Sequence, residues 1–336
     1  MTKSKYNLHC KYNLRSKLSQ RKKLHLRWKR GEIMSHSFLA KNVVVAYRGG
    51  GRALRQFDLD FSGKCLGVVG GEKDGKTTLI NAIAGLIKYE GEFVLDGRPL
   101  GKKPSDNNVQ AILEDYCLLK RKTVRENVEY PLKIRGEDVA PAESAIKSFG
   151  LTDFATLKAK KLPEQVKPYV AVARLSLVKR DLYLFDDILR PLSGIDKELF
   201  MMKLEEIFSH LDGMIVYATS DLEEARRFAD KIAIIYGGVI EQYGTYDELR
   251  NNPLSRKVAE YFDDKIEFHP TVLREFSGRL IVRYGDENIS LFEGSPAYLI
   301  DKRYIGREVQ VAPYKAGDAL KYLIIDPSTD KTILKY

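Results

Sequence analysis

The feature that most constrains the fold of this chain is the stretch Gly70–Thr78, which reads Gly-Gly-Glu-Lys-Asp-Gly-Lys-Thr-Thr. It fits the pattern G-x-x-x-x-G-K-[ST] of a phosphate-binding loop, or P-loop. The apolar run Leu66–Val69 before it predicts a buried strand, and the run Leu79–Ile87 after it predicts a helix. Backbone N–H groups in such a strand–turn–helix context can wrap a polyphosphate. A chance match in a turn is the alternative, and both flanks argue against it.

The residues of this loop have distinct expected roles. Lys76 is expected to reach the β- and γ-phosphate oxygens of ATP, and the hydroxyl of Thr77 to hold Mg²⁺. A second apolar run, Leu182–Phe185, ends in Asp186, whose carboxylate is expected to hold the hydration shell of the same ion. An Asp that caps a turn is the alternative for this position. The predicted nucleotide-binding residues of the loop are Gly70, Gly71, Glu72, Lys73, Asp74, Gly75, Lys76, Thr77 and Thr78.

The composition is that of an ordinary soluble protein with room for two domains. The chain has 336 residues, of which 44% are hydrophobic and 30% charged. No apolar run approaches the roughly 18–20 residues that cross a bilayer. The three cysteines, Cys10, Cys65 and Cys117, form no Cys-x-x-Cys pair. This argues against a disulfide framework or a zinc site and suits a reducing cytosol.

The net charge of +10 comes entirely from residues 1–33, which hold 11 Lys and Arg and a single acid, Glu32. A basic tail can bind anionic lipid or RNA. We favour instead a translation start at Met34, because Arg30-Gly31-Glu32 can be encoded by purine-rich codons that resemble a bacterial ribosome-binding site. An intact native mass that includes residues 1–33 would contradict this hypothesis. The rest of the chain is neutral, and no nucleic-acid partner is expected.

Pattern changes divide the chain after this basic extension into two domains, residues 34–263 and 264–336. Short strands and turns in the second domain predict a small β-barrel-like fold. The first domain reads as α/β, with strands and helices in alternation.

Within the first domain, alternation from Ser37 to Phe61 around a glycine-rich turn predicts an antiparallel hairpin. Residues 123–179 have a helical pattern, with breaks at Pro131 and Pro141. Further along, Met214–Ala218 predicts a buried strand, Asp221 caps the next helix, and Thr245 with Glu248 forms a capping box for a later one.

Further segments lie in a fixed order around the two phosphate-site motifs. They are Tyr47, Glu114–Leu119, Thr123–Val128, Val170–Arg174, Asp196 and Gly238–Thr245. With them, the chain from Phe38 to its C-terminus resembles the nucleotide-binding subunits of ABC transporters, above all the ATPases of maltose-type carbohydrate importers. The resemblance implies an ABC-type P-loop NTPase core with antiparallel β and helical subdomains, followed by a small OB-like regulatory domain that includes Tyr304–Val309. It also implies that Tyr47 stacks on adenine.

The segment at the family's signature departs from the usual pattern. The family offers a Ser hydroxyl and glycine N–H groups there to the γ-phosphate held by a partner chain. Here the segment reads Leu162-Pro163-Glu164-Gln165-Val166. Pro163 has neither a hydroxyl nor an N–H, and Glu164 adds negative charge in place of a glycine. Arg174 lies 12 residues before Asp186, which supports this register.

Three more positions of the chemical step are altered. The family's Q-loop glutamine is Glu114 here, which can still contact Mg²⁺, so the implied metal ligands are Thr77, Glu114 and Asp186. The general base, normally Glu, is Asp187, which is shorter by about 1.5 Å. The switch histidine is Ser220, which cannot become cationic. Losing one transition-state donor costs ~3–4 kcal/mol, so we expect ATP binding with weak or absent hydrolysis. Tolerated drift in a working enzyme is the alternative.

The resemblance implies an ATP-binding subunit of an ABC importer for a carbohydrate, at the cytoplasmic face of the bacterial membrane. Its implied partners are permease subunits, a second ATP-binding subunit and, indirectly, a solute-binding protein. Because the signature and the base are both altered, we favour a heterodimer over a homodimer. The residues expected to line a permease groove, or else to pack between subdomains, are Tyr116, Leu118, Leu119 and Thr123–Val128.

Other functions stay open. One is a regulatory ATP-binding protein that does not hydrolyse ATP. Another is the ATPase of a polyamine or anion importer. A ribosome-acting ABC protein is disfavoured, because that group normally has two cassettes and this chain has one P-loop.

Overall fold

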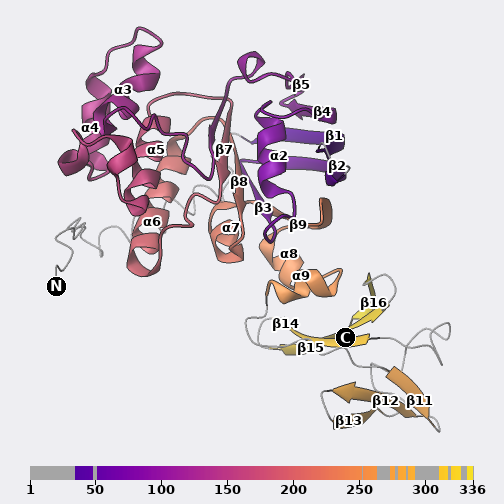
Figure 1. Ribbon diagram of the computed structural model, residues 1–336. Coiled ribbons are helices and arrows are strands. Elements are labelled where there is room, and N and C mark those ends of the chain that lie inside the picture. Colours follow the sequence, from indigo (N-terminus) through magenta and orange to yellow (C-terminus); the bar gives the residue numbers. More distant parts are fainter. Residues whose placement is uncertain are drawn as a thin grey trace. The chain divides into compact units, whose positions relative to one another are not determined.

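The computed structural model describes residues 35–47, 51–251 and 253–262, with residue 256 described by its backbone alone. Beyond residue 272 it describes the backbone of six strands (Figure 1). The chain divides into two compact units, Met1–Asp230 and Lys231–Tyr336. The predicted basic extension and the segment Tyr304–Val309 lie outside the described residues.

The first unit begins with an antiparallel sheet. Its strands, in the order β2-β1-β4-β5, are β2 (Arg52–Gly63), β1 (His36–Ala46), β4 (Glu90–Leu95) and β5 (Arg98–Pro99). Strands β1 and β2 pair in the register Phe38↔Phe61 and Ala40↔Leu59, and these four side chains are buried. Alternate residues of a strand share a face, so this register collects the apolar residues on one side of the sheet. The hairpin predicted from the alternation is confirmed.

The second sheet of this unit is parallel. Its strands follow one another as β3 (Cys65–Val69), β8 (Met214–Thr219), β7 (Leu182–Asp186) and β6 (Val109–Ile112). Every residue of β3, β7 and β8 is buried, as expected for strands covered on both faces. Parallel strands end at the same edge of their sheet, so the loops after β3, β7 and β8 meet there.

Helices cover the two faces of this parallel sheet. On one face, Phe185 of β7 packs against Phe208 of α6 (Gly194–His210), with ring centroids 4.9 Å apart. On the same face, Tyr217 of β8 packs against Phe228 of α7 (Leu222–Phe228) at 5.0 Å. Asp186 follows Phe185 and points to the other face, where α2 (Lys76–Ile83) contacts β7 and β8 (Figure 1).

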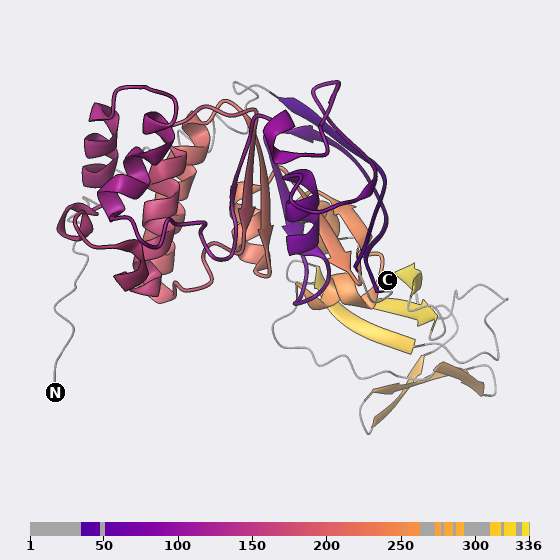
Figure 2. The same ribbon diagram turned by 45° about the horizontal axis from the view of Figure 1, so that its top comes forward.

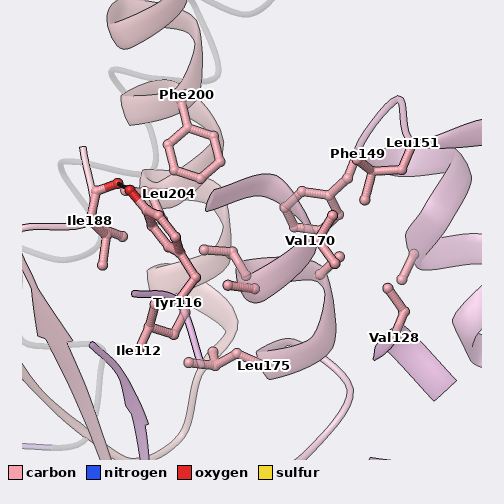
Figure 3. Close-up of a cluster of buried hydrophobic side chains, with 14 of the residues drawn as sticks. Ile112, Tyr116, Val128, Phe149, Leu151, Val170, Leu175, Ile188, Phe200 and Leu204 are labelled. Carbon is pink, nitrogen blue, oxygen red and sulfur yellow. Dashed lines mark hydrogen bonds between the residues drawn. The ribbon is translucent and has the colours of Figure 1, made fainter. Parts of the chain in front are cut away.

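The remaining helices of this unit pack on one another beside the sheet (Figure 2). They are α3 (Val124–Lys133), α4 (Ala140–Ser148) and α5 (Lys167–Leu175). Short 3₁₀ turns accompany the unit's loops: η1 (Pro104–Asp106), η2 (Thr152–Phe154), η3 (Ala159–Lys161) and η4 (Glu164–Val166). The apolar sides of helices α3, α4 and α5 meet in a buried cluster, part of which Figure 3 shows around Val170 and Leu175.

The break predicted at Pro131 is wrong. Helix α3 continues through Pro131 to Lys133, and the N–H of Ile134 donates to Tyr130 O at 3.1 Å. A proline inside a helix removes one backbone hydrogen bond, but here its ring is buried, so tertiary packing offsets that loss. Pro141 lies in the first turn of α4, where a missing N–H costs nothing, and the break there is confirmed.

Two roles were left open for Tyr116, lining a permease groove and subdomain packing, and its burial supports the second. Tyr116 is only 4% exposed, and its hydroxyl donates to the carbonyl oxygen of Ile188 at 3.3 Å (Figure 3). Val124 and Val128 are buried in the same cluster, and Leu118 packs against it. For these residues the structure supports the alternative of subdomain packing, because the cluster joins the helices to strands of the parallel sheet.

The second unit begins with the predicted hairpin, β9 (Lys231–Tyr236) and β10 (Val239–Gly244), followed by α8 (Tyr246–Asn251) and α9 (Arg256–Glu260). The capping box before α8 is confirmed, because Thr245 and Glu248 exchange side chain to N–H hydrogen bonds of 2.8 and 3.3 Å. Six strands follow in two antiparallel sheets: β11 (Leu273–Phe276), β12 (Arg279–Tyr284) and β13 (Glu287–Leu291), then β14 (Gln310–Ala316), β15 (Ala319–Asp326) and β16 (Lys331–Lys335). The loops that a barrel would need lie outside the described residues.

No helix among the described residues combines the length and the apolar character that crossing a membrane requires.

Candidate nucleotide-binding site

The P-loop leaves β3 and turns into α2 as the sequence predicts. Gly75 has φ 107°, a left-handed conformation that glycine adopts freely, and it precedes the first helical residue, Lys76. The ammonium group of Lys76 donates to the carbonyl oxygens of Gly70 at 2.8 Å and Gly71 at 2.9 Å. The Gly71 N–H donates to Asp74 Oδ2 at 2.7 Å. The loop is therefore braced by its own side chains, with its lysine directed back along it.

One residue of the loop has an unfavourable backbone conformation. Lys73 has φ 68°, where a residue with a Cβ is destabilised by about 1–2 kcal/mol relative to glycine. Because a new glycine also adds freedom to the unfolded chain, Lys73→Gly is expected to raise the free energy of unfolding by about 0.5–1 kcal/mol. Urea denaturation measures this. Lys103→Gly is the matched control, since Lys103 is exposed with φ −120°, and it should lower stability. A loss of stability in both variants contradicts the prediction.

The carboxylate of Asp186 is the strongest candidate for a metal-binding group. Asp186 is fully buried at the end of β7, and neither of its oxygens has a hydrogen-bond partner of normal geometry among the described residues. Burial raises its pKa to about 6, and the nearby Thr77 hydroxyl and Lys76 ammonium oppose that rise. A buried carboxylate without a partner is costly, and an oxygen-preferring cation would satisfy it.

This arrangement fits Mg²⁺ held jointly with phosphates. The described residues contain no group of three or more His, Cys, Asp and Glu side chains that could hold an ion by themselves. Nucleotide sites bind Mg²⁺ through one or two protein oxygens plus phosphate oxygens and water, so a complete protein cage is not needed. Asp186 and Thr77 are the residues that would hold the ion, and bound Mg²⁺ would neutralise phosphate charge.

The structure directs Asp187, at the position expected for the general base, towards the switch loop. Asp187 has φ 45°, a left-handed conformation that Asp tolerates better than Glu. Its Oδ1 accepts the Ser220 N–H at 2.9 Å and the Ser220 hydroxyl at 3.4 Å, and its Oδ2 lies 3.7 Å from the Lys76 ammonium. Asp187 and Ser220, the two positions expected to differ from the family pattern, thus contact each other, and the Asp187 carboxylate caps the turn after β8.

Glu114 and Tyr47 lie at the margins of the site. Glu114 is exposed after β6, and its carboxylate pairs with Arg190 in the loop after β7. Tyr47 is 50% exposed, and its hydroxyl lies 3.2 Å from that of Thr78 in α2. An exposed aromatic ring tied to the P-loop helix is suited to stacking on a flat base.

The segment at the predicted signature position forms the short turn η4 that leads into α5. Glu164 pairs with Lys167 at the start of the helix. The other end of α5 is tied to the loop after β6, because the Arg174 guanidinium donates to the carbonyl oxygens of Cys117 at 2.8 Å and Tyr116 at 3.1 Å. Both carbonyls belong to residues with positive φ, 49° and 63°.

Sequence reasoning missed two features around the site. Arg190, which pairs with Glu114, was not singled out. A buried network was missed as well: Glu224 of α7 accepts from Tyr217 and Thr219 at 2.8 Å each and pairs with Lys197 of α6 at 2.6 Å. This network fixes the two helices that follow the site strands.

The fold and this site define a P-loop nucleotide-binding protein, with the loop between a buried parallel strand and a helix and an acidic residue at the end of a neighbouring strand. Comparison with known proteins narrows the class. The family model described as ABC transporter matches residues 54–190. Those residues therefore form an ABC transporter ATP-binding domain, and the resemblance inferred from the motifs is confirmed.

Similar proteins carry names that describe transport or import ATP-binding proteins. The chain is 32% identical over 214 residues to the sulfoquinovosyl glycerol transport ATP-binding protein SmoE of Agrobacterium fabrum, covering 61% of this chain and 59% of that protein. It is 30% identical over 246 residues to the sn-glycerol-3-phosphate import ATP-binding protein UgpC of Vibrio cholerae, covering 70% and 65%. The trehalose import ATP-binding protein SugC of Mycobacterium tuberculosis is 32% identical over 230 residues, covering 66% and 58%. The chain thus spans less than two thirds of the length of these relatives.

Solved structures agree with the fold. A dimeric ATP-binding cassette in a post-hydrolysis state with ADP and Pi is 25% identical, with a TM-score of 0.56 over 62% of this chain and 98% of that one.

Proposed function

We propose that the chain is the ATP-binding subunit of an ABC importer that takes up a carbohydrate. The nucleotide part of this proposal is carried by the buried carboxylate of Asp186, which lies near Lys76 and Thr77 and has no hydrogen-bond partner of normal geometry in the part of the chain that the structure describes. The transport part is supported by relatives whose names describe trehalose import, sn-glycerol-3-phosphate import and sulfoquinovosyl glycerol transport. A polyamine or anion importer is the alternative cargo class.

The proposed partners follow from this role. The subunit would act at the cytoplasmic face of the membrane against permease subunits, with a solute-binding protein delivering the cargo to them. Because Pro163, Glu164, Asp187 and Ser220 all depart from the family pattern, we propose pairing with a second, more complete ATP-binding chain. Purification from native membranes tests this pairing. Recovery of this chain paired with itself alone, together with fast ATP turnover, would contradict it.

A second candidate function is a regulatory subunit that binds ATP without hydrolysing it. The observation that favours it is the engagement of Asp187 with the Ser220 N–H and the Lys76 ammonium, which occupies the carboxylate that would activate water. In the transport subunit and in the regulatory subunit alike, Lys76 and the N–H groups at the start of α2 would orient the phosphates. The two functions differ in whether phosphate is released.

ATP titration with a parallel measurement of phosphate release tests the proposal. The unmodified chain is expected to bind ATP, and Lys76→Ala to weaken that binding by roughly 100-fold, since it removes a buried cation from the phosphate site. Lys103→Ala, an exposed lysine outside the loop, is the matched control and should bind normally. Failure of the unmodified chain to bind ATP contradicts the proposed function. Binding without phosphate above the Lys76→Ala level selects the regulatory candidate.

A further inference from the structure

Arg190 joins two acidic side chains that come from different loops of the nucleotide site. Its guanidinium pairs with Glu114, which follows β6, and lies 3.7 Å from the carboxylate of Glu72 in the P-loop. Arg190 itself follows β7. The three loops leave the same edge of the parallel sheet, so residues far apart in the sequence meet there. The forked guanidinium can address two carboxylates at once, which a lysine ammonium does less well.

The charges at this edge of the sheet indicate that the Arg190 cation affects the binding of a negatively charged ligand. ATP carries about four negative charges, and the charged side chains that interact around the P-loop already include more acids than bases. The charged side chains that interact with one another or with the P-loop there are the acids Glu72, Asp74, Glu114, Asp186 and Asp187 and the bases Lys76 and Arg190, and Lys73 lies beside them in the loop. Lys76 lies near Asp187 and hydrogen-bonds to the loop carbonyls, so it does not compensate Glu114 or Glu72.

The pair contributes little to folding itself. The side chains of Arg190 and Glu114 are 62% and 56% exposed, and exposed ion pairs contribute at most about 1 kcal/mol to stability. If the Arg190 cation were removed, the unpaired carboxylates of Glu114 and Glu72 would repel the phosphates of ATP at the P-loop. The consequence of the arrangement is therefore expected in ligand binding rather than in protein stability.

We propose that Arg190 is a positioning residue for ATP binding: it holds Glu114 and Glu72 and cancels their repulsion of the polyphosphate. This explains how the site tolerates a glutamate where the family has an uncharged glutamine. The inference rests on the proposed function, because it concerns the same nucleotide site. It adds a residue from the loop after β7 to that site and makes Glu114 and Arg190 a functional pair.

The test is a double-mutant cycle on ATP affinity at low ionic strength. Arg190→Ala is expected to weaken ATP binding by roughly 5–10-fold, and Glu114→Gln in the same chain to restore it to within about twofold of the unmodified protein. Glu114→Gln alone is expected to strengthen binding by at least about twofold, since it frees the guanidinium for phosphate. The loss should shrink from ATP to ADP and vanish for adenosine, a pattern that loss of packing would not produce.

A matched control is available in the helical region. Arg125 is also exposed and paired with a glutamate, Glu143, and Arg125→Ala should leave ATP affinity unchanged. Thermal melting of each nucleotide-free variant checks folding. If Arg190→Ala does not fold, the Glu114→Gln single variant still decides the question.

The results of these binding experiments distinguish a failure of the Arg190 inference from a failure of the proposed function. If the unmodified chain does not bind ATP, the proposed function fails and the inference fails with it. If it binds ATP but Arg190→Ala binds equally well, the inference alone is wrong. The same holds if Glu114→Gln neither restores the variant nor strengthens binding by itself, or if adenosine binding falls as much as ATP binding.

Discussion

Asp186→Asn is expected to stabilise the nucleotide-free protein by about 2–3 kcal/mol at pH 7.5 while it weakens Mg²⁺-dependent ATP binding. Burial raises the pKa of Asp186 from 3.8 to about 6, which means that the folded state disfavours the ionised carboxylate. A shift of about two pH units corresponds to about 3 kcal/mol. The neutral amide removes that cost but is a poor ligand for Mg²⁺.

The pH dependence of this effect has a definite sign. Because the folded-state pKa is the higher one, the folded protein holds a proton that the unfolded chain has lost between about pH 4 and pH 6. The contribution of Asp186 to stability is therefore fully present below pH 4 and is lost as the pH rises through 6. The advantage of Asp186→Asn should be near zero at pH 4 and complete by about pH 7.

Urea denaturation at several pH values, without Mg²⁺, measures this difference. Asp230→Asn is the matched control, because the Asp230 carboxylate accepts the N–H groups of Lys64 at 2.7 Å and Cys65 at 2.9 Å. A carboxylate with two donors stabilises the fold, so that variant should be less stable than the unmodified protein. A destabilised Asp186→Asn protein at pH 7.5 would show that its carboxylate is already satisfied.

Restoring hydrolysis is expected to require several substitutions together. Pro163→Ser, Glu164→Gly, Asp187→Glu and Ser220→His in one chain should raise the rate of phosphate release by at least about 100-fold, the scale of one transition-state donor. Asp187→Glu alone should change the rate by less than about threefold, because residues that act as a unit do not contribute additively. The backbone at position 187 has φ 45°, and the Ser220 N–H still competes for the carboxylate.

The rate of phosphate release by each variant tests this prediction. Each variant is compared with the same variant that also carries Lys76→Ala, which serves as the inactive control. The comparison with the unmodified chain is decisive. If that chain already turns over ATP as fast as the fourfold variant, the altered positions are tolerated drift and the impaired-site hypothesis is wrong. Binding affinity should be similar in all chains that keep the P-loop lysine.

Elements that depend on neighbouring residues were predictable from the sequence. The P-loop, the strands around it and the hairpin of β1 and β2 follow from apolar patterns of period two and from glycine positions. The caps at Asp221 and Thr245 follow from side chains that satisfy N–H groups two or three residues away. Pro131 was misjudged because burial of its ring, a tertiary effect, outweighed a local rule.

Contacts between distant residues were not predictable in the same way. The sequence left open whether Tyr116 lines a groove or packs between subdomains, and in the structure Tyr116 and Cys117 both adopt positive φ and the ring turns into the core. That conformation is held by Arg174, 58 residues further along the chain from Tyr116. No local pattern announces a strained turn whose support comes from another helix.

The sequence by itself determined that this chain holds a phosphate-binding loop between a strand and a helix, because that motif is local and its chemistry lies in the backbone. Only the tertiary structure decided how the charges around the loop are paired. Asp187 meets Ser220, 33 residues away, and Glu114 meets Arg190, 76 residues away. Parallel strands bring the ends of distant segments to one edge, and which side chains meet there depends on strand order and register.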